Sequence, residues 1–242
     1  MRQSKLLSVS LSVLTAVFIL TASIALPILL RPFYHVHIDL LDLEARTGLS
    51  RTQITQAYGE MMDFCIGRTD TFSAGILPWS QSGRDHFADV RDLFLLDLRA
   101  AALSGLFLLG WTLIRRRCSV QPYRFMKRGF AFWGSVGLGS TFLFVGSLAA
   151  TNFARAFVLF HTLFFPGKDN WLFDPYTDPI IRILPQEFFR NCAILILGLL
   201  LMWCAALILS DLWSAGRRRR CQLAPPPGCG GNCNGCPGCG PQ

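Results

Sequence analysis

Residues 115–128, RRRCSVQPYRFMKR, carry six Arg or Lys side chains and no Asp or Glu. The segment lies between apolar stretches at about 93–114 and 130–150. Each stretch is long enough to cross a bilayer, which needs about 20 apolar residues. Because short basic loops between spans lie mainly in the cytoplasm, the segment predicts two antiparallel membrane helices joined on the cytoplasmic side.

Two further apolar stretches, at about 6–30 and 192–209, flank this pair. Charged residues make up only 16% of the chain, against about a quarter in a soluble domain. We therefore expect an all-α integral membrane protein with four transmembrane helices. Small residues near the end of the first stretch would also suit a signal peptide, but the run is longer than a usual h-region, which favours a span.

The orientation follows from where the charges lie. Basic residues precede the first span and follow the fourth, whereas residues 31–92 and 151–190 hold 13 of the 15 acids. This pattern predicts that both termini are cytoplasmic and that the two long segments, helical or irregular, lie over the outer ends of the spans. Asp97 and Arg99 lie within the second span, where we expect them to pair with each other or with a helix end near the interface.

The chain divides into a four-span membrane domain at 1–210, with outer segments 31–92 and 151–191, and a tail at 211–242. The tail is basic and then rich in Cys, Gly and Pro, so it is expected to be disordered and cytoplasmic. The spacing of Cys229, Cys233, Cys236 and Cys239 would suit a thiophilic metal. No His or folded scaffold accompanies these cysteines, so we expect neither a metal site nor a cofactor.

The net charge of +8 arises from short clusters beside the spans, and no basic face interleaved with aromatic residues is evident. A nucleic-acid partner is therefore not expected, whereas contact with membrane lipids is.

All four histidines fall in the predicted outer segments. His35 and His37 alternate without an evident third metal ligand, and we interpret them as interfacial polar residues. His86 leads into the second span one turn from Asp89, which can orient an imidazole. His161 leaves the third span among phenylalanines, an environment that keeps an imidazole neutral and basic. Each histidine alone is equally compatible with a structural role, but together they would suit acyl transfer from a lipid at the outer surface.

The chain resembles the bacterial lipoprotein intramolecular transacylase family, Lit, of integral membrane proteins. The resemblance rests on ITQAYGEMMDF (54–64), DHFADVRDLF (85–94) and LFHTLFFPGKDNWLFDPYTDPIIRILPQEFF (159–189). It extends from about residue 6 to 209, and the cysteine-rich tail departs from the family pattern.

The resemblance implies a multi-pass protein of the bacterial plasma membrane that acts on diacylglyceryl-modified lipoproteins. Such enzymes move the sn-2 acyl chain from glycerol to the α-amine of the N-terminal cysteine, giving a lyso-form lipoprotein. The two essential histidines of the family map onto His86 and His161. We expect supporting roles near these histidines, without a metal, for Asp89, Arg91, Tyr58, Asn170 and Trp171.

The leading alternative is a non-catalytic membrane protein that binds a lipid or a protein partner. A transporter is less favoured because the spans contain almost no polar residues at their centres.

Overall fold

The computed structural model describes residues 2–223, with side chains described for 3–216. The cysteines at 229, 233, 236 and 239 lie outside the described residues. The elements, in chain order, are β1 (Arg2–Ser4), α1 (Lys5–Leu29), α2 (Arg31–Leu40), α3 (Leu43–Thr47), α4 (Arg51–Cys65), α5 (Gln81–Ile114), β2 (Val120–Pro122), the 3-10 helix η1 (Phe125–Lys127), α6 (Phe130–Thr151), α7 (Phe153–Phe164), α8 (Ile180–Ile183) and α9 (Gln186–Leu223).

Four of these helices, α1, α5, α6 and α9, are long and apolar enough to cross a membrane among the described residues. Their surfaces carry apolar side chains that water would penalise, since Leu103, Leu113 and Phe144 are each at least 66% exposed. The expected helical architecture, with four helices able to span a membrane, is therefore confirmed, apart from two short strands. The helices extend beyond the apolar stretches of the sequence, because α5 begins at Gln81 and α9 continues to Leu223.

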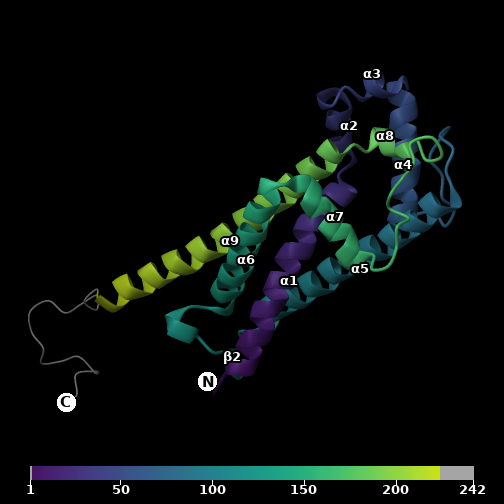
Figure 1. Ribbon diagram of the computed structural model, residues 1–242. Helices are drawn as coiled ribbons and strands as arrows, with labels where there is room; N and C mark the ends of the chain where they lie inside the picture. Colours follow the sequence, from purple (N-terminus) through teal and green to yellow (C-terminus); the bar gives the residue numbers. More distant parts are fainter. Residues whose placement is uncertain (1, 224–242) are drawn as a thin grey trace, which may run out of the picture.

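The four long helices form a bundle, and α2, α3, α4 and α8 form a cap at one end of it (Figure 1). The described N-terminus and the C-terminal end of α9 lie at the other end of the bundle. At that end β1 pairs with β2 in parallel, so the start of the chain is joined to the segment between α5 and α6.

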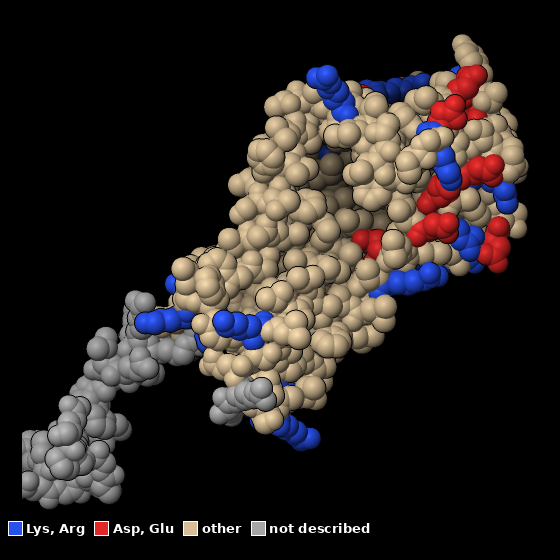
Figure 2. All heavy atoms as spheres, turned by 60° about the horizontal axis from the view of Figure 1, so that its bottom comes forward, with Lys and Arg blue, Asp and Glu red and all other residues tan. Residues whose placement is uncertain are grey.

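The charged residues follow this division of the molecule. On the face shown in Figure 2, Asp and Glu side chains gather mainly over the cap, together with some Lys and Arg. Blue side chains alone are visible at the opposite end of the bundle, and the surface is hollowed where the helices meet the cap. This distribution is the one on which the predicted membrane orientation depends.

The largest buried core belongs to the cap and not to the bundle. It includes Tyr34, Ile54 and Ile183, each fully buried, and Phe87 from the first turns of α5. The buried cluster inside the bundle is small, because apolar side chains there face outward. The cap is thus a small packed domain that holds the polar beginning of α5 in place.

The long helices approach closely where small residues face one another. A Cβ atom at Gly134 of α6 would lie 2.6 Å from the carbonyl oxygen of Ser12 on α1, so only glycine fits there. The expected partnership of Asp97 is wrong in detail: no ion pair joins it to Arg99, and its Oδ2 is buried without a hydrogen bond among the described residues. Residues two apart on a helix point to different faces, which explains the difference.

Candidate active site

The first turns of α5 carry His86 below the cap. Ser80 begins the helix, and its hydroxyl accepts a hydrogen bond from the backbone N–H of Gly83. The buried carboxylate of Asp178 accepts a second one, at 2.7 Å, from the backbone N–H of Ser80. The beginning of α5 is therefore fixed both by its own cap and by the segment that follows Trp171.

A break in the chain at Asn152 carries His161 to the same place. Asn152 separates α6 from α7, and its side chain accepts a hydrogen bond from the backbone N–H of Arg155. The reoriented helix α7 buries only His161 among its twelve residues. A short polar cap in an apolar sequence thus turns the end of the third span towards the start of the second.

His86 and His161 meet although 75 residues separate them in the sequence. Their ring centroids lie 5.9 Å apart with an interplanar angle of 33°. Their exposed fractions are 5% and 8%, so bulk water has little access to either ring. One small reacting group is able to contact both imidazoles at this separation.

Aromatic rings enclose the pair. Trp171 stacks on His161 with a centroid distance of 4.7 Å, and the edges of Phe165 and Phe173 pack against His86 at 5.0 and 5.4 Å. Phe157 is on the preceding turn of α7, and its ring centroid lies 4.3 Å from that of His161. The phenylalanine-rich setting expected around His161 is therefore present, and Phe173 joins it from the following segment.

The imidazole of His161 has a defined tautomer. Its Nδ1 lies 2.8 Å from the carbonyl oxygen of Phe157, which only accepts, so Nδ1 carries the proton and donates it. Its Nε2 makes no hydrogen bond within the described part of the chain and keeps a lone pair. For His86, Nδ1 is buried and has no hydrogen-bond partner there.

Both histidines are held in the neutral form. His86 precedes the apolar part of α5, and burial, followed by the neighbouring His161, lowers its pKa to about 4; Asp89 and Asn170 act in the opposite direction. Burial also lowers the pKa of His161, and its hydrogen bond to the Phe157 carbonyl opposes that shift. Two uncharged imidazoles therefore face each other at neutral pH.

Asp89, Asn170 and Lys168 form a polar border beside the pair. The carboxylate of Asp89 accepts from Lys168 Nζ at 2.6 Å and from the amide of Asn170 at 3.2 Å, and these contacts hold its pKa below the usual range against the effect of burial. Asp89 therefore does not hydrogen-bond His86, one turn away, and instead anchors the segment that carries Trp171. Sequence reasoning missed Lys168, because 79 residues separate it from Asp89.

Arg91 and Tyr58 lie elsewhere. Arg91 binds the carbonyl oxygen of Thr69 and the carboxylate of Asp70, and its guanidinium covers the ring of Phe64. Tyr58 stacks on Tyr34 inside the cap, with ring centroids 3.6 Å apart. Neither contacts His86 or His161, so both stabilise the cap around the pair without lining it.

The remaining histidines are not part of this cluster. His37 is buried in the cap, where Nδ1 bonds the Phe33 carbonyl at 2.7 Å and Nε2 lies 3.0 Å from the amide nitrogen of Asn191. Both of its nitrogens thus have partners, and its burial at 4% exposure corrects the expectation that His37 is an interfacial residue. Within residues 2–223, no three His, Cys, Asp or Glu side chains lie together as a metal site would require.

Solved structures of known proteins share this fold. The in meso structure of the membrane-integral lipoprotein intramolecular transacylase Lit from Bacillus cereus is 26% identical in sequence, with a TM-score of 0.78 over 89% of this chain and 97% of that one. A structure of that protein with one histidine replaced by alanine has a TM-score of 0.67 at 24% identity over 89% and 94% of the two chains, a similarity of fold alone.

Sequence comparisons agree. An uncharacterized protein of Aquifex aeolicus is 36% identical over 69 residues, 28% of this chain and 31% of that protein, so the match spans about a third of its length. The family model described as lipoprotein intramolecular transacylase Lit matches residues 9–189, more than half of the chain and both histidines of the pair. The chain therefore belongs to the lipoprotein intramolecular transacylase family, Lit, and is an integral membrane protein with an acyltransferase fold.

Proposed function

We propose that this protein transfers the sn-2 acyl chain of a diacylglyceryl-modified bacterial lipoprotein to the α-amine of its N-terminal cysteine, with His86 and His161 as the catalytic residues. The reaction gives a lyso-form lipoprotein. Its family membership supports the reaction class. The observation that carries the assignment of residues is the pair of neutral, buried imidazoles with centroids 5.9 Å apart.

His161 acts as the general base. Its Nδ1–H is committed to the Phe157 carbonyl, so Nε2 is the nitrogen that accepts a proton. The α-amine of a cysteine has a pKa of about 7.7–8.0, so part of it is unprotonated near neutral pH, and the neutral imidazole removes one proton as that unprotonated amine attacks the ester.

His86 polarises the ester carbonyl and stabilises the oxyanion that develops on it. A neutral imidazole in an apolar site is an effective donor to a developing negative charge, because no water competes for that charge. This role requires the proton of His86 on Nε2. Asp89 and Lys168 then act as positioning residues that hold Asn170 and Trp171 against the two rings.

The proposed step balances without a cofactor or a metal. The amine nitrogen forms a bond to the acyl carbon, and its proton moves to Nε2 of His161. The bond from that carbon to the sn-2 oxygen then breaks, and the proton on His161 passes to the departing alkoxide. Because donor and acceptor belong to one molecule, the step avoids much of the entropic cost of bringing them together. An ester becomes an amide, so the reaction proceeds downhill.

The test is expression in a bacterium that makes only diacylated lipoproteins, with lipoprotein N-termini determined by mass spectrometry. The wild-type chain should convert them to the lyso-form, and His86→Ala and His161→Ala should abolish the product. His35→Ala is the matched control, since His35 lies in the cap away from the pair and should retain activity. Absence of the lyso-form with verified expression of wild type would refute the proposed reaction, and full activity of either alanine variant at 86 or 161 would refute the paired mechanism.

A further inference from the structure

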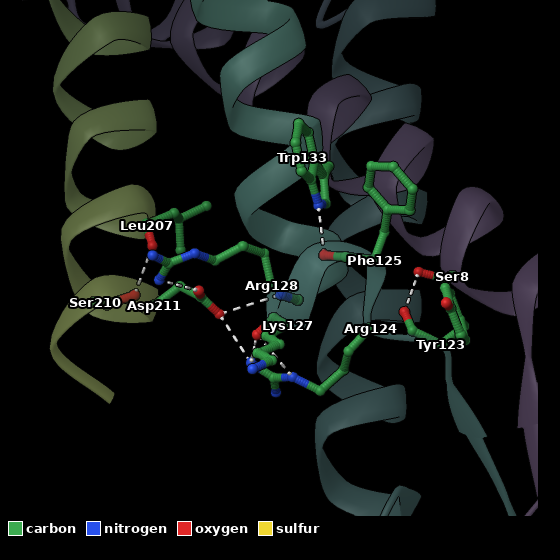
Figure 3. Close-up of polar contacts among 11 residues, drawn as sticks. Ser8, Tyr123, Arg124, Phe125, Lys127, Arg128, Trp133, Leu207, Ser210 and Asp211 are labelled. Carbon is green, nitrogen blue, oxygen red and sulfur yellow. Dashed lines mark hydrogen bonds and ion pairs between the residues drawn. The ribbon is translucent and has the colours of Figure 1, made fainter. Parts of the chain in front are cut away.

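The segment between α5 and α6 is held rigidly at the end of the bundle opposite the histidines. The hydroxyl of Ser8 on α1 donates to the carbonyl oxygen of Tyr123 at 2.9 Å. On the other side, the carboxylate of Asp211 on α9 accepts from the backbone N–H of Gly129 at 3.2 Å and pairs with Arg124 and Arg128 (Figure 3). These contacts fix the segment against both α1 and α9.

A cavity of about 240 Å³ lies behind this segment. Its lining includes Gln3, Trp111, Arg115, Gln121, Tyr123 and Arg124. The volume is below the range of about 300–1,000 Å³ that is typical for a drug-sized ligand, so it suits a small headgroup and not a whole lipid.

Two donors in the lining lack partners. Trp111 is 91% buried, and its indole Nε1 makes no hydrogen bond within the described residues. The guanidinium of Arg115 likewise has neither a carboxylate nor another acceptor there, whereas Arg124 on the same lining is paired with Asp211. The Trp111 N–H is a buried donor without an acceptor, which costs free energy, and an anionic oxygen in the cavity would relieve that cost. Arg115 is exposed, and its guanidinium would add a charge-assisted hydrogen bond to the same oxygen.

The residues around the cavity favour a ligand that is negatively charged and carries apolar chains. Residues 115–128 contain no acid, and Lys5 lies over the Tyr123 ring at 5.7 Å. The one acid beside the lining, Asp211, pairs with both Arg124 and Arg128 among the described residues, so the net charge around the cavity is positive. On α5, Leu113 is 71% exposed and Ile114 is 53% exposed, which provides an apolar surface beside the cavity for acyl chains. Basic cavities between membrane helices are suited to anionic lipid headgroups.

We propose that this cavity binds a phosphate group, with Arg115 and the indole N–H of Trp111 as its donors, and that the group is carried by an anionic phospholipid of the adjoining leaflet. The site is separate from the histidine pair and supplies no group to acyl transfer. It anchors the basic end of the bundle at the headgroup level of the membrane.

Native mass spectrometry of the full chain, purified in detergent and mixed with defined lipids, tests the proposal. Phosphatidylglycerol should be retained in preference to phosphatidylcholine. Arg115→Gln should weaken that retention about fivefold, since one basic residue near anionic lipid contributes about that factor. Arg116→Gln is the matched control, because it removes the same charge from a side chain that does not line the cavity. Trp111→Phe, which keeps the ring and removes the N–H, should also weaken retention.

A second experiment with inorganic phosphate distinguishes a lipid phosphate from free phosphate as the ligand. Displacement of phosphatidylglycerol by phosphate, or phosphate binding that is lost in Arg115→Gln, supports a phosphate site; phosphate binding without any lipid preference assigns the group to free phosphate instead. Equal loss in the Arg115 and Arg116 variants would indicate general charge attraction and overturn the site. Transacylation should be unchanged in Arg115→Gln, so failure here is distinguishable from failure of the proposed reaction.

Discussion

Nδ1 of His161 donates a hydrogen bond to the carbonyl oxygen of Phe157, one turn earlier on α7, at 2.8 Å. The backbone of α7 therefore fixes the ring orientation and the tautomer before any substrate arrives. A base arranged in this way is active only while Nε2 is unprotonated, which gives the first prediction.

The histidine pair should stay competent on acidification below pH 6.5. Burial lowers the pKa of both His86 and His161, so the neutral pair survives at a pH where ordinary histidines, with a pKa of about 6.5, become protonated. Rates are measured by mass spectrometry of a diacylated lipopeptide and divided at each pH by the unprotonated fraction of its α-amine, whose pKa is about 7.7–8.0. The acid limb that remains after this division should lie below pH 6.5, and a remaining limb at or above 6.5 would contradict the neutral pair.

Folding needs a parallel measurement, because the same pKa shifts affect stability. Between about pH 4 and 6.5 the unfolded chain binds more protons than the folded one at His86, so stability falls as the pH falls. Thermal unfolding in detergent at each pH separates this loss from a direct effect on the reaction.

Asp89→Asn should reduce the rate about tenfold. The substitution removes the charge that binds Lys168 and Asn170, and a hydrogen bond to a charged group contributes about 1.5–3 kcal/mol. The segment with Trp171 would then lose its anchor beside His161. Asp85→Asn is the control, because Asp85 is exposed one turn earlier on α5 and, among the described residues, makes polar contacts with Gln81 and Arg84 alone. Similar losses in the two variants would remove the positioning role of Asp89.

Trp171→Ala should slow the reaction by about threefold to tenfold, since an aromatic stacking contact contributes about 0.5–1.5 kcal/mol. The indole stacks on His161 and shields it from water. Trp171→Phe keeps a smaller ring in place and should lose less than the alanine variant. If the phenylalanine and alanine variants had identical rates, stacking would not explain the effect.

Gly83→Ala should destabilise the cap by about 1–3 kcal/mol, the usual cost of overpacking. A Cβ at this position would overlap the carboxylate of Asp178 and lie 3.0 Å from the ring of Phe173. Gly110→Ala, on the same helix with nothing within 4 Å of the new atom, should be tolerated. Thermal unfolding of both variants provides the measurement, and equal stability would show that Asp178 moves aside freely.

The membrane orientation is tested by reporter fusions. With both termini in the cytoplasm, a C-terminal alkaline phosphatase should be inactive and a C-terminal green fluorescent protein should fluoresce. Fusion after residue 75 in the first outer segment should give the reverse result. The opposite pattern would place the histidine pair on the cytoplasmic side, away from the lipidated N-termini of exported lipoproteins.

The sequence predicts the bundle well because its signals are local. Apolar runs and basic loops identify the four spans, and the polar sequence before residue 93 indicates that His86 precedes the apolar part of α5. Asn152, three residues before Arg155, carries an N-cap signal that could have located the start of α7.

The site is less accessible to such reasoning because its contacts are distant in sequence. The ion pair between Lys168 and Asp89 depends on how the cap folds over α5. The ion pair between Arg91 and Asp70 depends on the same folding. Nothing in the sequence distinguishes Asp89, which borders the histidine pair, from Arg91, two residues later, which does not.

The unbroken course of α5 from the cap into the bundle has a consequence for how a substrate is reached. His86 stands seven residues before the predicted span, so at most about 10 Å of helix separates it from the hydrocarbon, and less where the helix is tilted from the membrane normal. The headgroup layer, which contains the glycerol esters, is about 5–8 Å deep on each side of the membrane. A lipoprotein would therefore react while its acyl chains stay in the bilayer. The enzyme would need to bind only the glycerol esters and the N-terminal cysteine that joins them to the peptide.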